Sequence, residues 1–208
     1  MIIKVCGIKH QANLDMISGA SIDMIGLNFY PPSPRYIRTH ISTSKPTIST
    51  VGIFVNETLE NIKSISSVYN LDYVQLHGSE DIATCKSVSH FAKVIKVFRL
   101  KTDFNWDQVE QFIPYTSYFL FDTHTALYGG SGKKFDWSLL NKYTHATPFL
   151  LSGGIMPDDA AEILEIQHPR FSGIDINSGF ELEAGVKDIN KIKSFTKEIR
   201  NGSKLPDR

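Results

Sequence analysis

Short apolar or β-branched runs recur along the chain and predict eight β-strands. The runs cover residues 2–6, 24–29, 51–55, 73–76, 93–98, 118–121, 148–151 and 173–176. Between most of them, apolar residues recur at helical spacing, as at Leu59, Ile62, Ile65 and Val68, or at Ile189, Ile192, Phe195 and Ile199. Strands and helices therefore alternate along the chain.

This alternation predicts the fold class. Strands this apolar are typical of a parallel sheet covered by helices rather than an antiparallel sheet with one wet face. Eight such units in 208 residues favour a single α/β domain, a (β/α)8 TIM barrel, over an open doubly wound sheet. We expect the barrel to span residues 1–201 and residues 202–208 to form a flexible C-terminal tail. The loop 30–42, with three prolines and two arginines, breaks the helical period.

Composition narrows the possible partners and the cellular location. Lysine plus arginine total 22 and aspartate plus glutamate total 22, so net charge gives no reason to expect binding to nucleic acid or a membrane. Every apolar run is far shorter than the roughly 18 residues of a membrane helix, which predicts a cytoplasmic protein. Cys6 and Cys85 form no CxxC pair, so we expect two free thiols and no metal site.

The informative polar residues follow the predicted strands, because a barrel of this kind builds its site at the C-terminal strand ends. These residues are Cys6, Asn28, Arg35, Asn56, Gln75, His77, Arg99, Asp122, Ser152 and Asn177.

Two glycine-bearing strand ends predict a phosphate site. They are "LLSGGI" and "INSGFE", after the seventh and eighth strands, and they contain Gly153, Gly154, Ser178 and Gly179. Adjacent backbone amides in such loops bind phosphate in many barrels, although each motif alone is also typical of a tight turn. The segment "YGGSGK", with Gly130, is predicted to close over the same ligand, and it lacks the spacing of a nucleotide-binding loop.

Cys6 and Asp122 are the candidates for proton transfer. A single strand cysteine is often core filler, and a thiolate at neutral pH needs a positive or hydrogen-bonding environment. Lys4 lies on the same strand face, but our preferred interpretation pairs it in the barrel with Asp175. Asp122 comes directly after the sixth run, where it suits a helix cap or a solvated position equally well. Over one shared cavity, the thiol and the carboxyl predict an acid and a base that flank the ligand.

The chain resembles the phosphoribosylanthranilate isomerase family of tryptophan biosynthesis over almost its whole length. The matching blocks, in order, are "KVCGI", "GLNFYPPSPRYI", "VGIFVN", "VQLHGSE", "FDTHTALYGGSGKKFDW", "LSGGI" and "GIDINSGFELEAGVKD". The resemblance implies the Amadori rearrangement of N-(5-phosphoribosyl)anthranilate to 1-(2-carboxyphenylamino)-1-deoxyribulose 5-phosphate. Two blocks depart from the family pattern: Asn177 stands where serine is common, and "IMPDD" stands where "LNPEN" is more frequent.

The resemblance also implies roles for individual residues. It makes Cys6 the general base, Asp122 a protonated general acid, and Arg35 the contact for the anthranilate carboxylate. Gln75 and His77 then line the same cavity, with a purely structural hydrogen bond as the alternative for His77. The implied partner is a small phosphorylated sugar-amine, handled without metal or organic cofactor by a monomer or homodimer.

Two other functions remain open at this point. A histidine-pathway relative performs the same rearrangement on a different amine, but it is expected to carry aspartate where Cys6 stands, and Arg35 also argues against it. A phosphate-ligand sensor without catalysis would use Cys6 as a redox switch. Turnover of the substrate separates the sensor from an isomerase.

Overall fold

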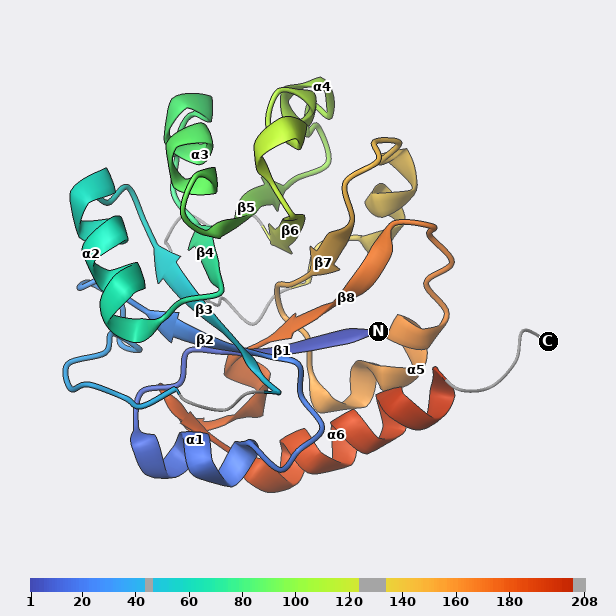
Figure 1. The fold of residues 1–208 in the computed structure, drawn as a ribbon. Helices are drawn as coiled ribbons and strands as arrows, with labels where there is room; N and C mark the ends of the chain where they lie inside the picture. The colour runs from blue at the N-terminus through green and yellow to red at the C-terminus, as the bar shows by residue number, and fades with distance from the viewer. Residues whose placement is uncertain (44–46, 124–133, 204–208) are drawn as a thin grey trace.

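The strands form a closed parallel barrel in sequence order, which confirms the predicted fold class (Figure 1). The computed structural model describes residues 1–43, 47–123 and 134–203. The barrel strands are β1 (Ile2–Cys6), β2 (Met24–Asn28), β3 (Ser49–Phe54), β4 (Tyr73–Leu76), β5 (Lys93–Leu100), β6 (Tyr118–Thr123), β7 (Phe149–Leu151) and β8 (Phe171–Ile176).

Some strands extend beyond the apolar runs that predicted them. β3 begins at Ser49, before its apolar run, because Ser49 pairs with Met24 of β2. β5 continues to Leu100, which pairs with Thr123 of β6. Backbone pairing with a neighbouring strand therefore fixes these ends, and hydrophobicity alone does not report it.

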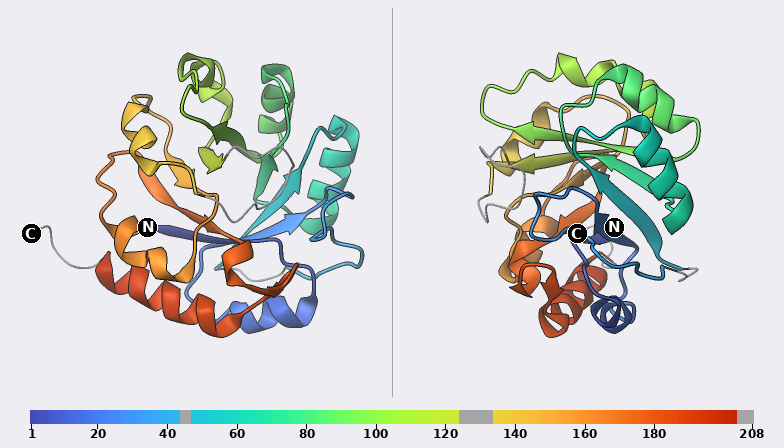
Figure 2. Two further views of the ribbon diagram at one scale, coloured as in Figure 1. Left: turned by 180° about the vertical axis from the view of Figure 1, so that it is seen from behind. Right: turned by 90° about the vertical axis from the view of Figure 1, so that its left-hand side faces the viewer.

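Helical segments surround the barrel (Figures 1 and 2). Over the described residues, each connection between consecutive barrel strands contains one, except the connection from β2 to β3. The connection from β2 to β3 carries no helix over its described residues 29–43 and 47–48, as its prolines predict. The helices are α1 (Gln11–Ile17), α2 (Leu59–Tyr69), α3 (Ile82–Ser89), α4 (Asp107–Glu110), α5 (Ala160–Leu164) and α6 (Ile189–Gly202), with a 3-10 helix, η2 (Trp137–Lys142), before β7. Within the described part of the chain, no helix is long and apolar enough to cross a membrane.

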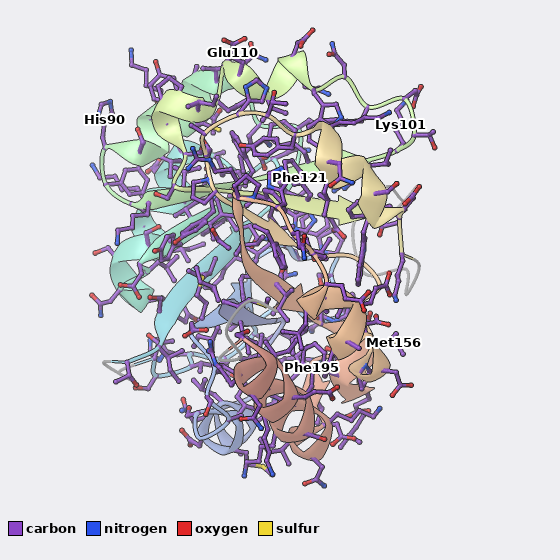
Figure 3. All side chains as sticks on the ribbon, turned by 90° about the vertical axis from the view of Figure 1, so that its right-hand side faces the viewer. His90, Lys101, Glu110, Phe121, Met156 and Phe195 are labelled. Carbon is purple, nitrogen blue, oxygen red and sulfur yellow. The ribbon has the colours of Figure 1, made fainter. Side chains whose placement is uncertain are left out.

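The C-terminal helix packs against the first helix on the outside of the barrel, which is itself closed by pairing of β1 with β8. α6 lies beside α1 and buries Ile192, Phe195 and Ile199, which its apolar spacing predicts (Figures 1 and 2). Figure 3 shows Phe195 within the body of the molecule, whereas the labelled polar residues of the α3 and α4 region lie at its edge. α6 ends at Gly202, one residue beyond the predicted end of the barrel, and residues 204–208 of the predicted tail lie outside the described residues.

A small hairpin after β8 is absent from the sequence prediction. It consists of β9 (Glu181–Glu183) and β10 (Val186–Lys187), preceded by a 3-10 turn, η4 (Ser178–Phe180). Its strands are only three and two residues long, so the brief alternation at Glu181–Leu182–Glu183 is too short to predict a strand. The turn depends on Gly185, whose φ of 90° favours glycine.

Alternation along the strands determines which side chains point into the barrel. Its interior holds an apolar layer that includes Met24, Val51, Tyr73, Ile95, Leu120 and Leu150. Lys4 and Asp175 also face inward and form a buried ion pair of 2.8 Å, as predicted. The inward positions nearest the C-terminal strand ends lie at the mouth of the barrel, and they include Cys6, His77 and Asp122.

Candidate active site

A cavity opens at the C-terminal ends of the strands and contains most of the predicted site residues. The space there, open solvent included, amounts to about 730 Å³. Its lining includes Cys6, Arg35, His77, Asp122, Gly153, Gly154 and Ser178. These residues come from six different strand ends, so the closed barrel brings them together. The predicted residue Gly130 lies outside the described part of the chain.

Cys6 occupies a tight, buried position at the end of β1. Its side chain is 7% exposed, and Gly26 of β2 stands beside it in register. A Cβ atom on Gly26 would lie 2.9 Å from the Cys6 Sγ, so the absence of a side chain there makes room for the thiol. Burial raises the pKa of the Cys6 thiol, while the positive charges of Lys4 and Lys187 act in the opposite direction. The neutral thiol therefore predominates in the unliganded site at neutral pH.

Asp122, the penultimate residue of β6, has its carboxyl at the cavity. Its Oδ1 accepts a hydrogen bond of 2.8 Å from the Thr123 backbone N–H, and its Oδ2 lies 3.3 Å from His77 Nε2. A Cβ atom on Gly153 would come within 2.6 Å of Asp122 Oδ1 and 2.3 Å of Thr123 Oγ1. The glycine therefore allows the turn after β7 to approach the carboxyl closely.

Arg35 lines the cavity from the loop after β2 and is fixed by Glu181. Its Nε and Nη2 donate to the Glu181 carboxylate at 2.9 and 2.6 Å, a bidentate pairing that orients the guanidinium plane. Lys187 Nζ donates to the same carboxylate at 2.7 Å and to Asn177 Oδ1 at 2.7 Å. Burial alone would raise the pKa of Glu181, but the hydrogen bond from Arg35 and the charge of Lys187 hold it below its ordinary value.

Sequence reasoning assigned no role to Glu181 or Lys187. Both lie in "GIDINSGFELEAGVKD", so the resemblance flagged the segment but not these contacts. The same network explains Asn177, which departs from the family pattern: its side-chain oxygen accepts from Lys187 and connects the end of β8 to β10. We infer no further consequence from "IMPDD".

The loops after β7 and β8 both reach the cavity, and the first of them requires glycine. Gly153 and Gly154 both adopt positive φ, 90° and 69°, which side chains other than glycine rarely allow. Together with Ser178 they line one side of the cavity. Gly179 packs against the neighbouring loop instead: a Cβ atom there would lie 2.5 Å from the Ile155 carbonyl oxygen.

The remaining predicted residue, Gln75, lies beside the cavity lining rather than in it. Gln75 is fully buried, and its Nε2 lies 3.0 Å from His77 Nδ1. Only His77 of this pair lines the cavity. Among the described residues, no group of three or more histidine, cysteine, aspartate or glutamate side chains is arranged to hold a metal ion.

The two thiols are expected to differ in reactivity. Cys85 is fully buried in α3, and burial raises its pKa to about 11, whereas Cys6 lines the cavity. We expect iodoacetamide to alkylate Cys6 before Cys85 in the folded protein, at a rate that rises with pH as more thiolate forms. Peptide mass spectrometry after timed reaction measures this order, with Cys6→Ser as the control. Faster labelling of Cys85 would contradict the described burial.

Known proteins resemble this chain over nearly its full length. Residues 3–198 match the family model described as N-(5'phosphoribosyl)anthranilate (PRA) isomerase. A protein of that name from Parabacteroides distasonis is 44% identical, with 96% of this chain and 93% of the relative covered.

Two solved structures combine high coverage with similar sequence. The phosphoribosyl anthranilate isomerase of Thermotoga maritima has a TM-score of 0.79 and 33% identity, covering 97% of this chain and 100% of that one. Another structure of such an isomerase holds reduced 1-(o-carboxyphenylamino)-1-deoxyribulose 5-phosphate. It has a TM-score of 0.76 and 30% identity, with the same coverage.

Proposed function

Because the chain belongs to the N-(5'-phosphoribosyl)anthranilate isomerase family, we propose that Cys6 and Asp122 carry out its reaction as general base and general acid. The protein is an isomerase of tryptophan biosynthesis, and its substrate is a small phosphorylated molecule. The single observation that carries our residue assignment is the shared cavity: the thiol from β1 and the carboxyl from β6 line it together, beside the Gly153–Gly154 turn.

The first step opens the sugar ring. Asp122 gives a proton to the ribose ring oxygen, and the bond between that oxygen and C1 breaks. The lone pair of the aniline nitrogen forms a double bond to C1, which gives a protonated Schiff base. The hydrogen on C2 becomes acidic because the positive nitrogen can take up the electrons of the C2–H bond.

The second step moves hydrogen away from C2. The Cys6 thiolate removes the C2 proton, and the bond electrons form a C1–C2 double bond while the C1–N π electrons return to nitrogen. The resulting enolamine loses its O2 proton and gains one at C1, which yields the ketone. Cys6 has then gained one proton and Asp122 has lost one, so exchange with solvent restores both groups before the next turnover.

Contacts at the two ends of the substrate position it in this proposal. Backbone amides at Gly153 and Gly154, with Ser178, bind the phosphate group. The Arg35 guanidinium, already oriented by Glu181, binds the anthranilate carboxylate. With both ends of the substrate held, C1 and C2 lie between the thiol and the carboxyl. A cytoplasmic location, the absence of nucleic-acid partners and a monomeric or homodimeric state remain our predictions.

Incubation with N-(5-phosphoribosyl)anthranilate tests the proposed activity. The purified protein should consume it in the presence of EDTA and without added cofactor, and a change in fluorescence follows the loss of the anthranilate compound. Folded protein that binds the reduced product but turns nothing over would support the sensor alternative and contradict the proposal.

A further inference from the structure

We propose that His77 is a positioning residue for Asp122: its tautomer is set by Gln75, and it stabilises the charge that Asp122 acquires on giving up its proton. This inference rests on the proposed role of Asp122 as general acid. It assigns His77 a role through Asp122, in place of the direct substrate contact that the sequence suggests.

The three side chains form a chain of contacts from β4 to β6 at the mouth of the barrel. Gln75 and His77 are successive inward positions at the end of β4, and Asp122 is the matching inward position on β6. The Gln75 Nε2 lies 3.0 Å from His77 Nδ1, and His77 Nε2 lies 3.3 Å from Asp122 Oδ2. The imidazole therefore connects a fully buried amide to the carboxyl in the cavity.

The backbone around the imidazole is held from both sides. The His77 N–H donates to the Phe54 carbonyl oxygen at 2.9 Å, and Arg99 Nη2 donates to the His77 carbonyl oxygen at 2.9 Å. The next residue, Gly78, donates its backbone N–H to Glu80, whose carboxylate forms a buried 2.8 Å ion pair with Lys96. These contacts fix the position from which the ring reaches Asp122.

The Gln75 amide nitrogen that faces His77 Nδ1 determines which imidazole nitrogen carries the proton. The Gln75 amide nitrogen can only donate, so His77 Nδ1 accepts and the ring proton of neutral imidazole lies on Nε2. That Nε2–H points to Asp122 Oδ2, while Thr123 N–H occupies Oδ1. Asp122 thus faces two donors, and its carboxylate is a better acceptor than its protonated form.

This arrangement favours the transition state over the ground state. As the Asp122 proton moves to the ribose ring oxygen, negative charge develops on the carboxyl, and the bond from His77 Nε2–H strengthens. An interaction that strengthens in this way lowers the barrier rather than merely improving substrate binding. The present separation of 3.3 Å is longer than a strong charge-assisted hydrogen bond, and we expect it to shorten when substrate is bound.

A double-mutant cycle with Asp122 tests the inference. We expect His77→Leu to lower kcat about 10- to 100-fold, the effect of losing one hydrogen bond to a charged group, with KM and the Kd for reduced product nearly unchanged. In an Asp122→Asn background the same change should have almost no further effect, because His77 acts only through Asp122. His77→Gln, which keeps an N–H donor, should recover part of the loss. Gln75→Leu should reduce kcat in the same direction as His77→Leu.

The controls separate this inference from the proposed function. His90→Leu makes the same substitution at an exposed position next to α3 and should leave kcat unchanged. If the His77→Leu variant does not fold, the same measurements are made on His77→Ala. Equal losses in both Asp122 backgrounds, or a raised KM at constant kcat, would overturn the inference while leaving Asp122 as the acid. An unchanged kcat in Asp122→Asn alone would instead overturn the proposed function.

Discussion

Replacing Cys6 with serine is expected to lower kcat by about 10²- to 10⁴-fold, the contribution typical of general base catalysis. A serine hydroxyl fits the space beside Gly26, but it is far less acidic than a thiol and supplies no base at neutral pH. Binding of the reduced product should therefore change little, because phosphate and carboxylate contacts do not involve Sγ.

Steady-state kinetics together with calorimetric titration of the reduced product measures both quantities. Cys85→Ala provides the matched control: Cys85 lies in α3 outside the cavity, so its loss should leave kcat intact. An unchanged kcat in Cys6→Ser would remove Cys6 from the mechanism. Loss of kcat and of binding in equal measure would indicate a packing role.

Replacing Asp122 with asparagine is expected to lower kcat by about 10²- to 10⁴-fold with a much smaller change in KM. Asparagine keeps an oxygen that can accept from the Thr123 N–H, so the end of β6 should keep its shape. The amide has no proton to give to the ribose ring oxygen, and ring opening should become slow.

An exposed aspartate outside the cavity provides the control for the Asp122→Asn variant. Asp103→Asn removes a carboxyl that is 77% exposed, and we expect it to retain full kcat. Substrate that is bound but not opened should accumulate on Asp122→Asn in a single-turnover experiment. Matching losses in kcat and in product binding would assign Asp122 a structural role instead.

The sequence predicted the barrel because strand and helix periods are local properties. Alternation along β1, β4 and β6 also places Cys6, His77 and Asp122 on the inward face of each strand, and the barrel fold brings those strand ends to one mouth. This part of the candidate site therefore follows from the alternation of side chains along each strand together with the fold class.

Contacts between segments that lie far apart in the sequence could not be predicted from local sequence patterns. Glu181 pairs with Arg35 across 146 positions of sequence, and nothing near either residue reports the contact. The environment of Cys6 shows the same limit. Its neighbour Lys4 is bound to Asp175, and burial is the largest influence on the thiol, which raises its pKa rather than lowering it.

The positive groups near Cys6 suggest how the thiolate forms at turnover. Lys4 and Lys187 both oppose the effect of burial on the Cys6 pKa, and Lys187 is itself fully buried against Glu181. Burial lowers the pKa of Lys187, and the nearby Glu181 carboxylate counteracts this in part. In the proposed mechanism, the balance among these buried charges sets how much Cys6 thiolate is available to remove the C2 proton.

A crystal structure of the protein with the reduced product bound tests the central claim most directly. We expect Cys6 Sγ to approach C2 and an Asp122 carboxyl oxygen to approach the C4 hydroxyl, the former ring oxygen, from opposite sides of the chain at contact distance, about 3.5 Å. The phosphate should lie against the amides of Gly153 and Gly154. A ligand that places either the thiol or the carboxyl away from these atoms would contradict the account.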